Sequence, residues 1–307
     1  MRIAVCIPTF NRKNLLIKTL EAVSLQSLKP KCIFLFDNHS SDGTQELLIE
    51  KDYINEINGV TVEYFYSEIN GGGALGFYHG MKTAFDKGCY DAFWMLDDDG
   101  VPDINCLELL SKYIKEYNYV SPILMDINNP ELLNVPYNGS SDPKILMKDN
   151  NNLELLEGYC NPFNGGLYSL KAVKKVGFPK PELFIYGDEM NYHQRMVEAG
   201  FKPYGVFLAR HMHPIVRTDN LRTFAHCVRF RDVKWSFYCA CRNSVYNKKT
   251  RKEILIKKIA KLAYYGGAHI LFFILINPSF VYLRLFVKSF QDGLFERWGR
   301  QYEFINK

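Results

Sequence analysis

Three consecutive carboxylates, Asp97, Asp98 and Asp99, directly follow an apolar run at residues 93–96. Such a run is typical of a buried strand, so we expect the aspartates where the chain leaves the core. Adjacent negative charges at a partly buried strand end repel one another unless a cation or hydrogen-bond donors neutralise them. Carboxylate oxygens favour hard ions such as Mg²⁺ or Mn²⁺. The triplet therefore indicates either a divalent-metal site or a solvated acidic turn.

Strand-like and helix-like patterns alternate through the first hundred residues. The apolar runs predict strands at residues 3–7, 32–36, 60–66 and 91–96. Helical periodicity separates them, which predicts a parallel, doubly wound α/β sheet. Ligands bind beyond the carboxyl ends of the strands in such sheets. Four polar clusters should therefore converge on one rim, which favours a metal site over an acidic turn: residues 9–11, 37–42, 70–73 and 97–99.

Residues 71–76 match the dinucleotide-binding pattern GxGxxG between an expected strand and an expected helix. Asp97 even lies at a distance downstream that is typical of a ribose-binding acid. However, the match falls in the third strand–helix turn instead of the first, and three acids follow instead of one. The pattern therefore disfavours a dinucleotide-dependent oxidoreductase. We interpret the glycines as permitting close backbone approach to a nucleotide sugar or to the acidic loop.

A second acidic pair, Asp188 and Glu189, directly precedes an expected helix. Acids at a helix N-terminus are favoured by the backbone dipole, so simple capping explains the pair; the alternative is a general base. Further on, His211 and His213 follow an expected strand at residues 204–208. Their spacing of two places both on one face of an extended segment, although a metal needs only one of them. Residues 128–152 are predicted to form loops.

The composition is that of a globular protein, with 47% hydrophobic and 23% charged residues. Eight cysteines without a CxxC pair disfavour zinc and thioredoxin-type sites. The N-terminus shows no signal-peptide pattern, so we expect free thiols in a reducing cytoplasm. The formal net charge of +5 is concentrated after Arg242, where twelve Lys or Arg residues accompany four Asp or Glu. We expect no nucleic-acid partner.

The C-terminal region, residues 221–307, is expected to be helical, basic and aromatic, and distinct from a domain at residues 1–220. Its longest uninterrupted apolar run, at residues 270–276, is far shorter than the ~20 residues that a bilayer span needs. Lysine-rich faces beside Leu, Phe and Tyr predict helices lying in a membrane interface. The alternative is a helical domain that packs on the α/β body or on a second copy of the chain.

Taken together, these motifs resemble the family 2 glycosyltransferases of the GT-A fold. The resemblance covers roughly residues 1–215. Residues 70–80 with 94–102 look most like the branch that includes bacterial galactofuranosyltransferases and rhamnosyltransferases. The resemblance implies a Rossmann-like, mostly parallel sheet flanked by helices, with a C-terminal helical extension. It rests on residues 7–12, 37–44 and 70–73, on the aspartate triplet, and on the acidic pair six to seven residues before Arg195.

The resemblance also implies a role for each matching residue. Asp97 and Asp99 would hold Mn²⁺ or Mg²⁺ on a diphosphate, with His213 favoured over His211 as a further ligand. Glu189, with Asp188 as the alternative, would be the catalytic base. The nucleotide-sugar donor would be bound by Pro8, Thr9, Asn11, Arg12, Asp37, Asn70, Gly71, Gly72, Asp97 and Asp98.

The expected function is inverting transfer of a sugar to a bacterial surface glycan, such as an O-antigen or capsule, or to a lipid-linked acceptor. We expect UDP-galactofuranose as donor, with dTDP-rhamnose as the alternative. The expected location is the cytoplasmic face of the cytoplasmic membrane, as a peripheral protein. An alternative of another class is a non-catalytic sugar-nucleotide or polysaccharide-binding module, which the complete set of acids disfavours.

Overall fold

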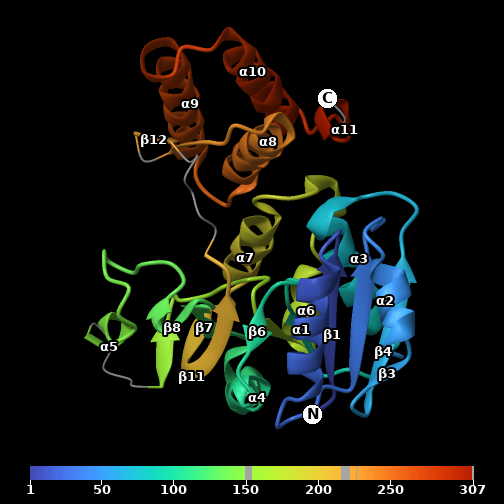
Figure 1. Ribbon diagram of the computed structural model, residues 1–307. Coiled ribbons are helices and arrows are strands. Elements are labelled where there is room, and N and C mark those ends of the chain that lie inside the picture. The colour runs from blue at the N-terminus through green and yellow to red at the C-terminus, as the bar shows by residue number, and fades with distance from the viewer. Residues whose placement is uncertain (149–153, 216–221, 226, 306–307) are drawn as a thin grey trace. The chain divides into compact units, whose positions relative to one another are not determined.

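The apolar runs of the first hundred residues form four neighbouring parallel strands of one sheet (Figure 1). β1 and β2 are buried along their whole length, which explains why they read as continuous apolar runs. All four predicted strands are confirmed, with boundaries shifted by one or two residues at most. In spatial order they are β4 (Val60–Tyr66), β2 (Cys32–Asp37), β1 (Ile3–Thr9) and β5 (Ala92–Met95).

Beyond β5 the sheet is mixed. β10 (Gly166–Ser169) runs antiparallel between β5 and β7 (Tyr119–Asp126), and β7 pairs in parallel with β11 (Tyr204–His213). The α/β fold is confirmed, but only the half from β4 to β5 is parallel throughout. The remaining strands all pair antiparallel: β3 (Glu56–Ile57), β6 (Val101–Pro102), β8 (Asn129–Leu133) and β9 (Leu155–Glu157).

Helices cover both faces of the parallel strands. α1 (Lys13–Ser24) packs Leu16 and Leu20 into the same hydrophobic cluster as Val5. α3 (Gly72–Asp86) covers the opposite face, because a Cβ at Gly80 would lie 3.2 Å from that of Cys6. The other helices are α2 (Thr44–Glu50), α4 (Cys106–Tyr117), α5 (Ile145–Lys148), α6 (Leu170–Val176) and the 3₁₀ turn η1 (Pro181–Leu183).

The computed structural model describes residues 1–148, 154–215, 222–225 and 227–305. The α/β unit comprises Met1–Pro181 and Arg195–Val216, and the helical unit comprises Glu182–Gln194 and Arg217–Lys307. The predicted domain boundary at residue 220 lies outside the described residues. The segment Glu182–Gln194 belongs to the helical unit although the sequence analysis assigned it to the first domain.

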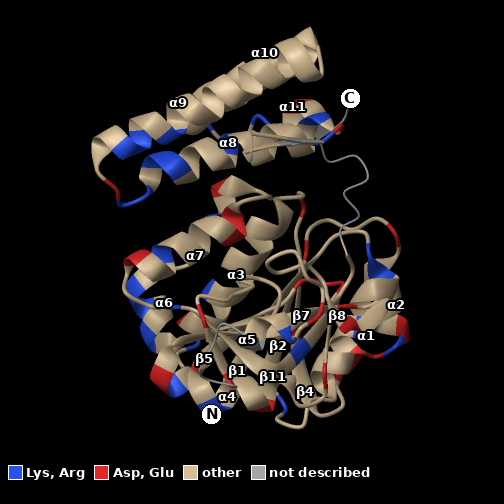
Figure 2. Cartoon of the chain, turned by 90° about the vertical axis from the view of Figure 1, so that its left-hand side faces the viewer, with Lys and Arg blue, Asp and Glu red and all other residues tan. Residues whose placement is uncertain are grey.

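The helical unit has its own aromatic core, which includes Phe237, Phe272 and Phe286. α9 (Leu255–Leu271) continues into the π-helical turn η2 (Phe272–Ile276), and α10 (Phe280–Leu294) returns beside it as a hairpin (Figure 1). Lys and Arg residues gather where α8 ends and α9 begins (Figure 2). The unit also contains α8 (Lys234–Thr250), α11 (Tyr302–Ile305) and the start of α7 (Asp188–Glu198).

Two local predictions were partly wrong. Residues 128–152 were predicted as loops, but they contain β8 and α5. Residues 221–246 were predicted as helical, but the described part begins with a β-hairpin of β12 (Arg222–Phe224) and β13 (Val228–Phe230). The strands β8, β12 and β13 have three to five residues each, so pairing with a neighbouring strand decides their conformation more than local pattern does.

The helix that spans Leu255–Ile276 has 22 residues and a mean hydropathy of 1.7 in its most apolar window. By length and composition it is the one candidate membrane span among the described residues. The sequence analysis counted only uninterrupted apolar residues and therefore excluded a span. Core helices of soluble proteins pass the same test when they are mostly buried, but only 28% of this window is buried.

Candidate active site

The acidic triplet lies in the loop between β5 and β6. Thr9, at the end of β1, donates its hydroxyl to Asp98 Oδ2 at 2.7 Å. Arg12 donates to Asp99 Oδ2 at 2.7 Å and to Asp98 Oδ1 at 3.2 Å. The side chain of Asp98 is therefore occupied by protein groups, and Arg12 offsets part of the negative charge of the triplet.

Asp97, Asp99 and His213 form a compact group of possible metal ligands, with one ligand atom from each within 4.8 Å of the others. His213 Nε2 lies 3.1 Å from Asp99 Oδ1, but the contact lacks hydrogen-bond geometry. Both atoms are buried and have no hydrogen-bond partner among the described residues. Buried polar atoms normally have a partner, and two carboxylates with one imidazole suit a divalent ion such as Mn²⁺. The residues present therefore fit a metal.

The electrostatics of this group reflect its burial and its crowding. Burial raises the pKa of Asp97 to about 7, and the charge of Asp99 adds to the shift. Burial also acts to raise the pKa of Asp99, but His213 and Arg12 outweigh it and leave that pKa below its ordinary value. Burial acts to lower the pKa of His213, yet Asp99 and Asp97 raise it overall. Near neutral pH the group therefore retains protons that a divalent cation would displace.

His211, the alternative ligand, lies outside this group. Its ring is fully buried, and neither ring nitrogen has a hydrogen-bond partner among the described residues. Burial lowers the pKa of His211 to about 3, so the ring is neutral. The ring lies against the acidic loop, because a Cβ added at Gly100 would meet His211 Nε2 at 2.1 Å. His211 thus packs behind the loop, and Gly100 is required for this close approach.

Thr19 also positions the acidic loop, and the sequence analysis missed this role. Its hydroxyl, on α1, lies 3.0 Å from the carbonyl oxygen of Asp98 and 2.8 Å from that of Gly100. Thr19 is fully buried. In the sequence Thr19 lies at helical spacing from Leu16 and next to Leu20, so a hydroxyl among leucines was the only available signal.

The loops after β1 and β2 are linked by hydrogen bonds to Asn11, a residue predicted to bind the donor. The Ser41 amide donates to Asn11 Oδ1 at 2.7 Å, and the Asn11 amide donates to Ser40 Oγ at 2.9 Å. Asp37 is completely buried; it accepts from the Ser40 amide at 2.7 Å and from the Tyr64 hydroxyl at 2.9 Å. Together with the contact of Thr9 to Asp98, these bonds confirm that the polar clusters converge on one rim.

The glycine cluster joins the same rim from α3. The Gly72 amide donates to Asn70 Oδ1 at 2.9 Å, and Gly72 has a φ of 74°, which favours glycine. Gly71 is the N-cap residue of α3. One turn further along the helix, a Cβ on Gly76 would lie 2.4 Å from the Cβ of Pro8. Gly76 therefore permits close packing of α3 against the end of β1, whereas Gly72 provides the positive φ at the start of the helix.

Asp188 and Glu189 are the first two residues of α7 and belong to the helical unit. Asp188 is 5% exposed, whereas Glu189 is partly exposed and accepts from the Gly187 amide at 2.9 Å. The segment before them is fixed by α8. Asn243 Nδ2 donates within 3.0 Å to the carbonyl oxygens of Leu183, Ile185 and Tyr186, and Asn247 Nδ2 donates to that of Gly187 at 2.8 Å.

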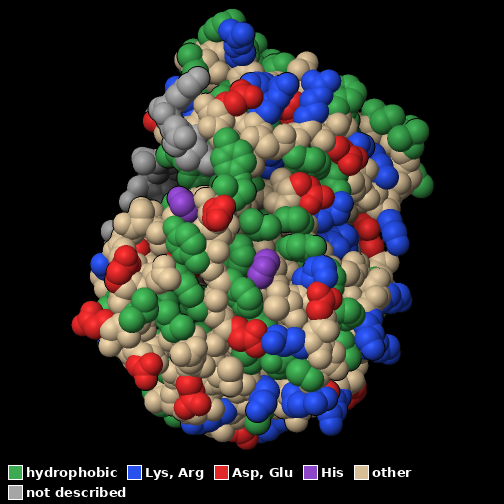
Figure 3. Space-filling view, turned by 90° about the vertical axis from the view of Figure 1, so that its right-hand side faces the viewer, with side chains coloured by type: hydrophobic (Ala, Val, Ile, Leu, Met, Phe, Trp, Pro, Cys, Tyr) green, Lys and Arg blue, Asp and Glu red, His purple; other side chains and the backbone are tan. Residues whose placement is uncertain are grey.

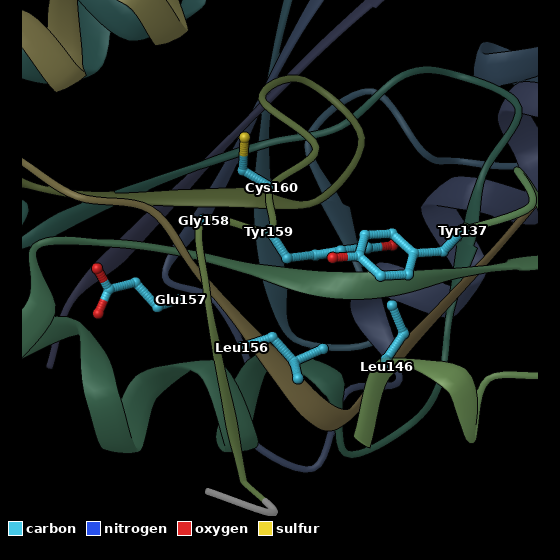
Figure 4. Close-up of a pocket in the computed structure, with 7 residues that line it drawn as sticks. All are labelled: Tyr137, Leu146, Leu156, Glu157, Gly158, Tyr159 and Cys160. Carbon is cyan, nitrogen blue, oxygen red and sulfur yellow. The ribbon is translucent and has the colours of Figure 1, made fainter. Parts of the chain in front are cut away.

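A separate cavity of about 350 Å³ lies in the α/β unit (Figure 4). Tyr137 and Tyr159 extend into it from opposite sides, while Glu157 forms an ion pair with Lys202 at 2.8 Å. None of the predicted site residues lines this cavity. Its lining consists of Tyr137, Leu146, Leu156, Glu157, Gly158, Tyr159 and Cys160.

Solved structures with the same fold are GT-A glycosyltransferases. GalNAc-T7 with UDP, GalNAc and Mn²⁺ aligns with a TM-score of 0.60 at 14% identity, over 97% of this chain and 56% of that one. Staphylococcus aureus TarS aligns with a TM-score of 0.57 at 14% identity, over 99% of this chain. The chain spans about half the length of that TarS chain, 50%.

The chain belongs to glycosyl transferase family 2, whose model matches residues 4–177. It is 32% identical over 216 residues to galactofuranosyltransferase GlfT1 of Mycolicibacterium smegmatis, covering 67% of this chain and 68% of that protein. The galactofuranosyltransferase GlfT1 of Mycobacterium tuberculosis is 30% identical over 213 residues, covering the same shares of the two chains. The predicted family is therefore confirmed.

Proposed function

We propose that the protein is an inverting, metal-dependent glycosyltransferase that transfers galactofuranose from UDP-galactofuranose to a bacterial surface glycan or a lipid-linked acceptor. The observation that carries this proposal is the buried group of Asp97, Asp99 and His213, in a chain 32% identical to a galactofuranosyltransferase. The alternative donor from the same branch of the family is dTDP-rhamnose.

Asp97, Asp99 and His213 would hold the divalent ion. Such an ion neutralises charge that develops on a diphosphate leaving group. The predicted donor residues Pro8 and Asp37 lie at the ends of β1 and β2, and Asn11 lies in the loop after β1. An α/β sheet binds its ligands at this edge. Arg12 pairs with two aspartates, but its side chain is half exposed and could therefore also contact a phosphate oxygen.

Glu189 is the proposed base. Its carboxylate takes the proton of an acceptor hydroxyl, whose oxygen forms a bond to the anomeric carbon. The bond from that carbon to the diphosphate breaks, the nucleoside diphosphate leaves, and the configuration inverts. The greater exposure of Glu189 supports this choice over the 5% exposed Asp188.

We place the reaction at the cytoplasmic face of the membrane. The apolar, largely exposed helix Leu255–Ile276 and the basic segment before it support this location. Both features favour contact with anionic lipid at an interface. A lipid-linked glycan acceptor would be presented at the same surface.

A panel of nucleotide sugars tests the reaction, scored by release of nucleoside diphosphate with Mn²⁺, with Mg²⁺ and with EDTA. We expect turnover with UDP-galactofuranose in metal and none in EDTA. Highest turnover with dTDP-rhamnose would reassign the donor. Donor binding without any turnover would support a non-catalytic binding module instead.

A pair of isosteric variants tests the base. Glu189→Gln removes the proton acceptor, so we expect turnover to fall about 10²- to 10⁴-fold, with donor affinity near normal. Asp188→Asn is the matched control and should retain far more turnover. The reverse ranking of the two variants would assign the base to Asp188.

A further inference from the structure

The helical unit contains a cavity of about 610 Å³ that none of the proposed site residues lines. Its walls come from one face of α10, from the segment that includes α11, and from the first residue of α8. We call it the basic pocket. A cavity of this volume is within the usual range for a small-molecule site. It is lined by Lys234, Val281, Arg284, Leu285, Val287, Lys288, Gln291, Arg300, Glu303 and Phe304.

Four of these side chains are cationic and one is acidic. Lys288 pairs with Glu303, and Arg300 Nη1 lies 3.4 Å from Oδ1 of the buried Asp292. Lys234 and Arg284, in contrast, form no ion pair with any residue that the structure describes. The basic pocket therefore has an excess of positive charge and two cations available for an anionic ligand.

The mouth of the basic pocket adjoins an exposed apolar end of the hairpin. Phe280 is 77% exposed and Leu275 is 67% exposed, although both are large hydrophobic residues. Val281 belongs to this apolar end and also lines the basic pocket. The helical part of Figure 3 likewise shows hydrophobic and basic side chains side by side on the surface. We call Ile274, Leu275, Ile276, Phe280 and Val281 the apolar tip.

We propose that the basic pocket binds the phosphate group of a membrane lipid, whose hydrocarbon chain runs past Val281 into the bilayer that the apolar tip contacts. The cations of the basic pocket would bind the phosphate of the head group, and the adjoining hydrophobic surface would contact the hydrocarbon chain. A soluble phosphate compound would account for the cations but would leave the apolar tip in water. This ligand is additional to the donor and does not depend on which sugar is transferred.

The test measures binding of the full-length protein to vesicles of phosphatidylcholine with and without phosphatidic acid. Each basic residue near an anionic surface contributes ~1 kcal/mol, or about fivefold in binding. The double variant Lys234→Gln with Arg284→Gln should therefore bind phosphatidic acid vesicles about 25-fold more weakly. The matched control Lys171→Gln with Lys174→Gln removes two exposed cations of α6, in the α/β unit, that do not line the basic pocket. It should lose much less binding.

Equal losses of vesicle binding in the two double variants would overturn the proposal that the basic pocket is a specific site. They would show that the anionic vesicles respond only to the total positive charge of the protein. Thermal unfolding of both variants excludes misfolding as the cause. Two further measurements distinguish the sources of phosphate. Leu275→Ser with Phe280→Ser should reduce vesicle binding, and glycerol phosphate should bind far more weakly than vesicles. Unchanged vesicle binding by that variant, or tight binding of glycerol phosphate, would overturn the lipid assignment.

Discussion

Thr19→Val tests how much one buried hydroxyl contributes to metal binding by the group of Asp97, Asp99 and His213. The Thr19 hydroxyl has a single proton and lies within 3.0 Å of two backbone carbonyl oxygens, those of Asp98 and Gly100. Valine has nearly the same shape, so the substitution removes the donor without opening a cavity. A buried acceptor that loses its donor costs about 1–3 kcal/mol.

The lost hydrogen bond destabilises the observed conformation of the acidic loop, which carries Asp97 and Asp99. If about 1.4 kcal/mol of it is expressed in the metal-bound state, affinity for Mn²⁺ falls tenfold. Partners of metal ligands typically change metal affinity by 10- to 100-fold when they are removed. We therefore expect Thr19→Val to weaken Mn²⁺ binding about tenfold while the protein stays folded.

The assay is a titration of the metal-free protein with Mn²⁺, with unbound Mn²⁺ read by electron paramagnetic resonance. Thr19→Ser retains the hydroxyl and is the matched control, so it should retain most of the affinity. Wild-type affinity in a folded Thr19→Val protein would refute the role of Thr19 in positioning the acidic loop. Equal losses in both variants would show that the lost methyl packing matters and the hydroxyl does not.

Three further predictions concern other parts of the structure. Gly100→Ala places a Cβ 2.1 Å from His211 Nε2, so we expect destabilisation by about 1–3 kcal/mol in urea unfolding and weaker Mn²⁺ binding; wild-type stability would contradict the close contact. Asn243→Ala removes the donor to three carbonyl oxygens before Glu189, so turnover should fall while Mn²⁺ affinity stays unchanged; loss of both would argue against a role confined to this segment. Burial lowers the pKa of His269 to about 4, below the ~6.5 of an unfolded chain, so the unfolded state binds the proton first. The free energy of unfolding should therefore fall by about 3 kcal/mol between pH 6.5 and pH 4, and His269→Gln should reduce this loss; an unchanged pH dependence in that variant would show that other groups cause it.

Much of the α/β unit could be predicted from the sequence. Buried parallel strands such as β1 appear as continuous apolar runs, and polar residues directly after them mark the rim where ligands bind. The contact of Thr9 with the acidic loop and that of Asn11 with the loop after β2 followed from this rule. The same rule does not apply to an antiparallel strand that comes later in the sequence and lies between two earlier strands of the sheet. The position of β10 between β5 and β7 was therefore not predicted.

Contacts between distant residues were harder to predict. Thr19 is 79 residues from Asp98 in sequence, and a threonine on an apolar helix face is usually a packing residue. Asn243 contacts the segment before Glu189 across more than fifty residues. Each contact depends on how elements pack, which neither helical periodicity nor local motifs encode.

The ion pairs of Arg12 with Asp98 and Asp99 have a consequence for the stability of the acidic loop between catalytic cycles. A permanent side-chain charge already balances part of the triplet, so the three carboxylates repel one another less strongly before any cation binds. If the proposed metal dependence holds, the protein should therefore stay folded but inactive when metal is scarce.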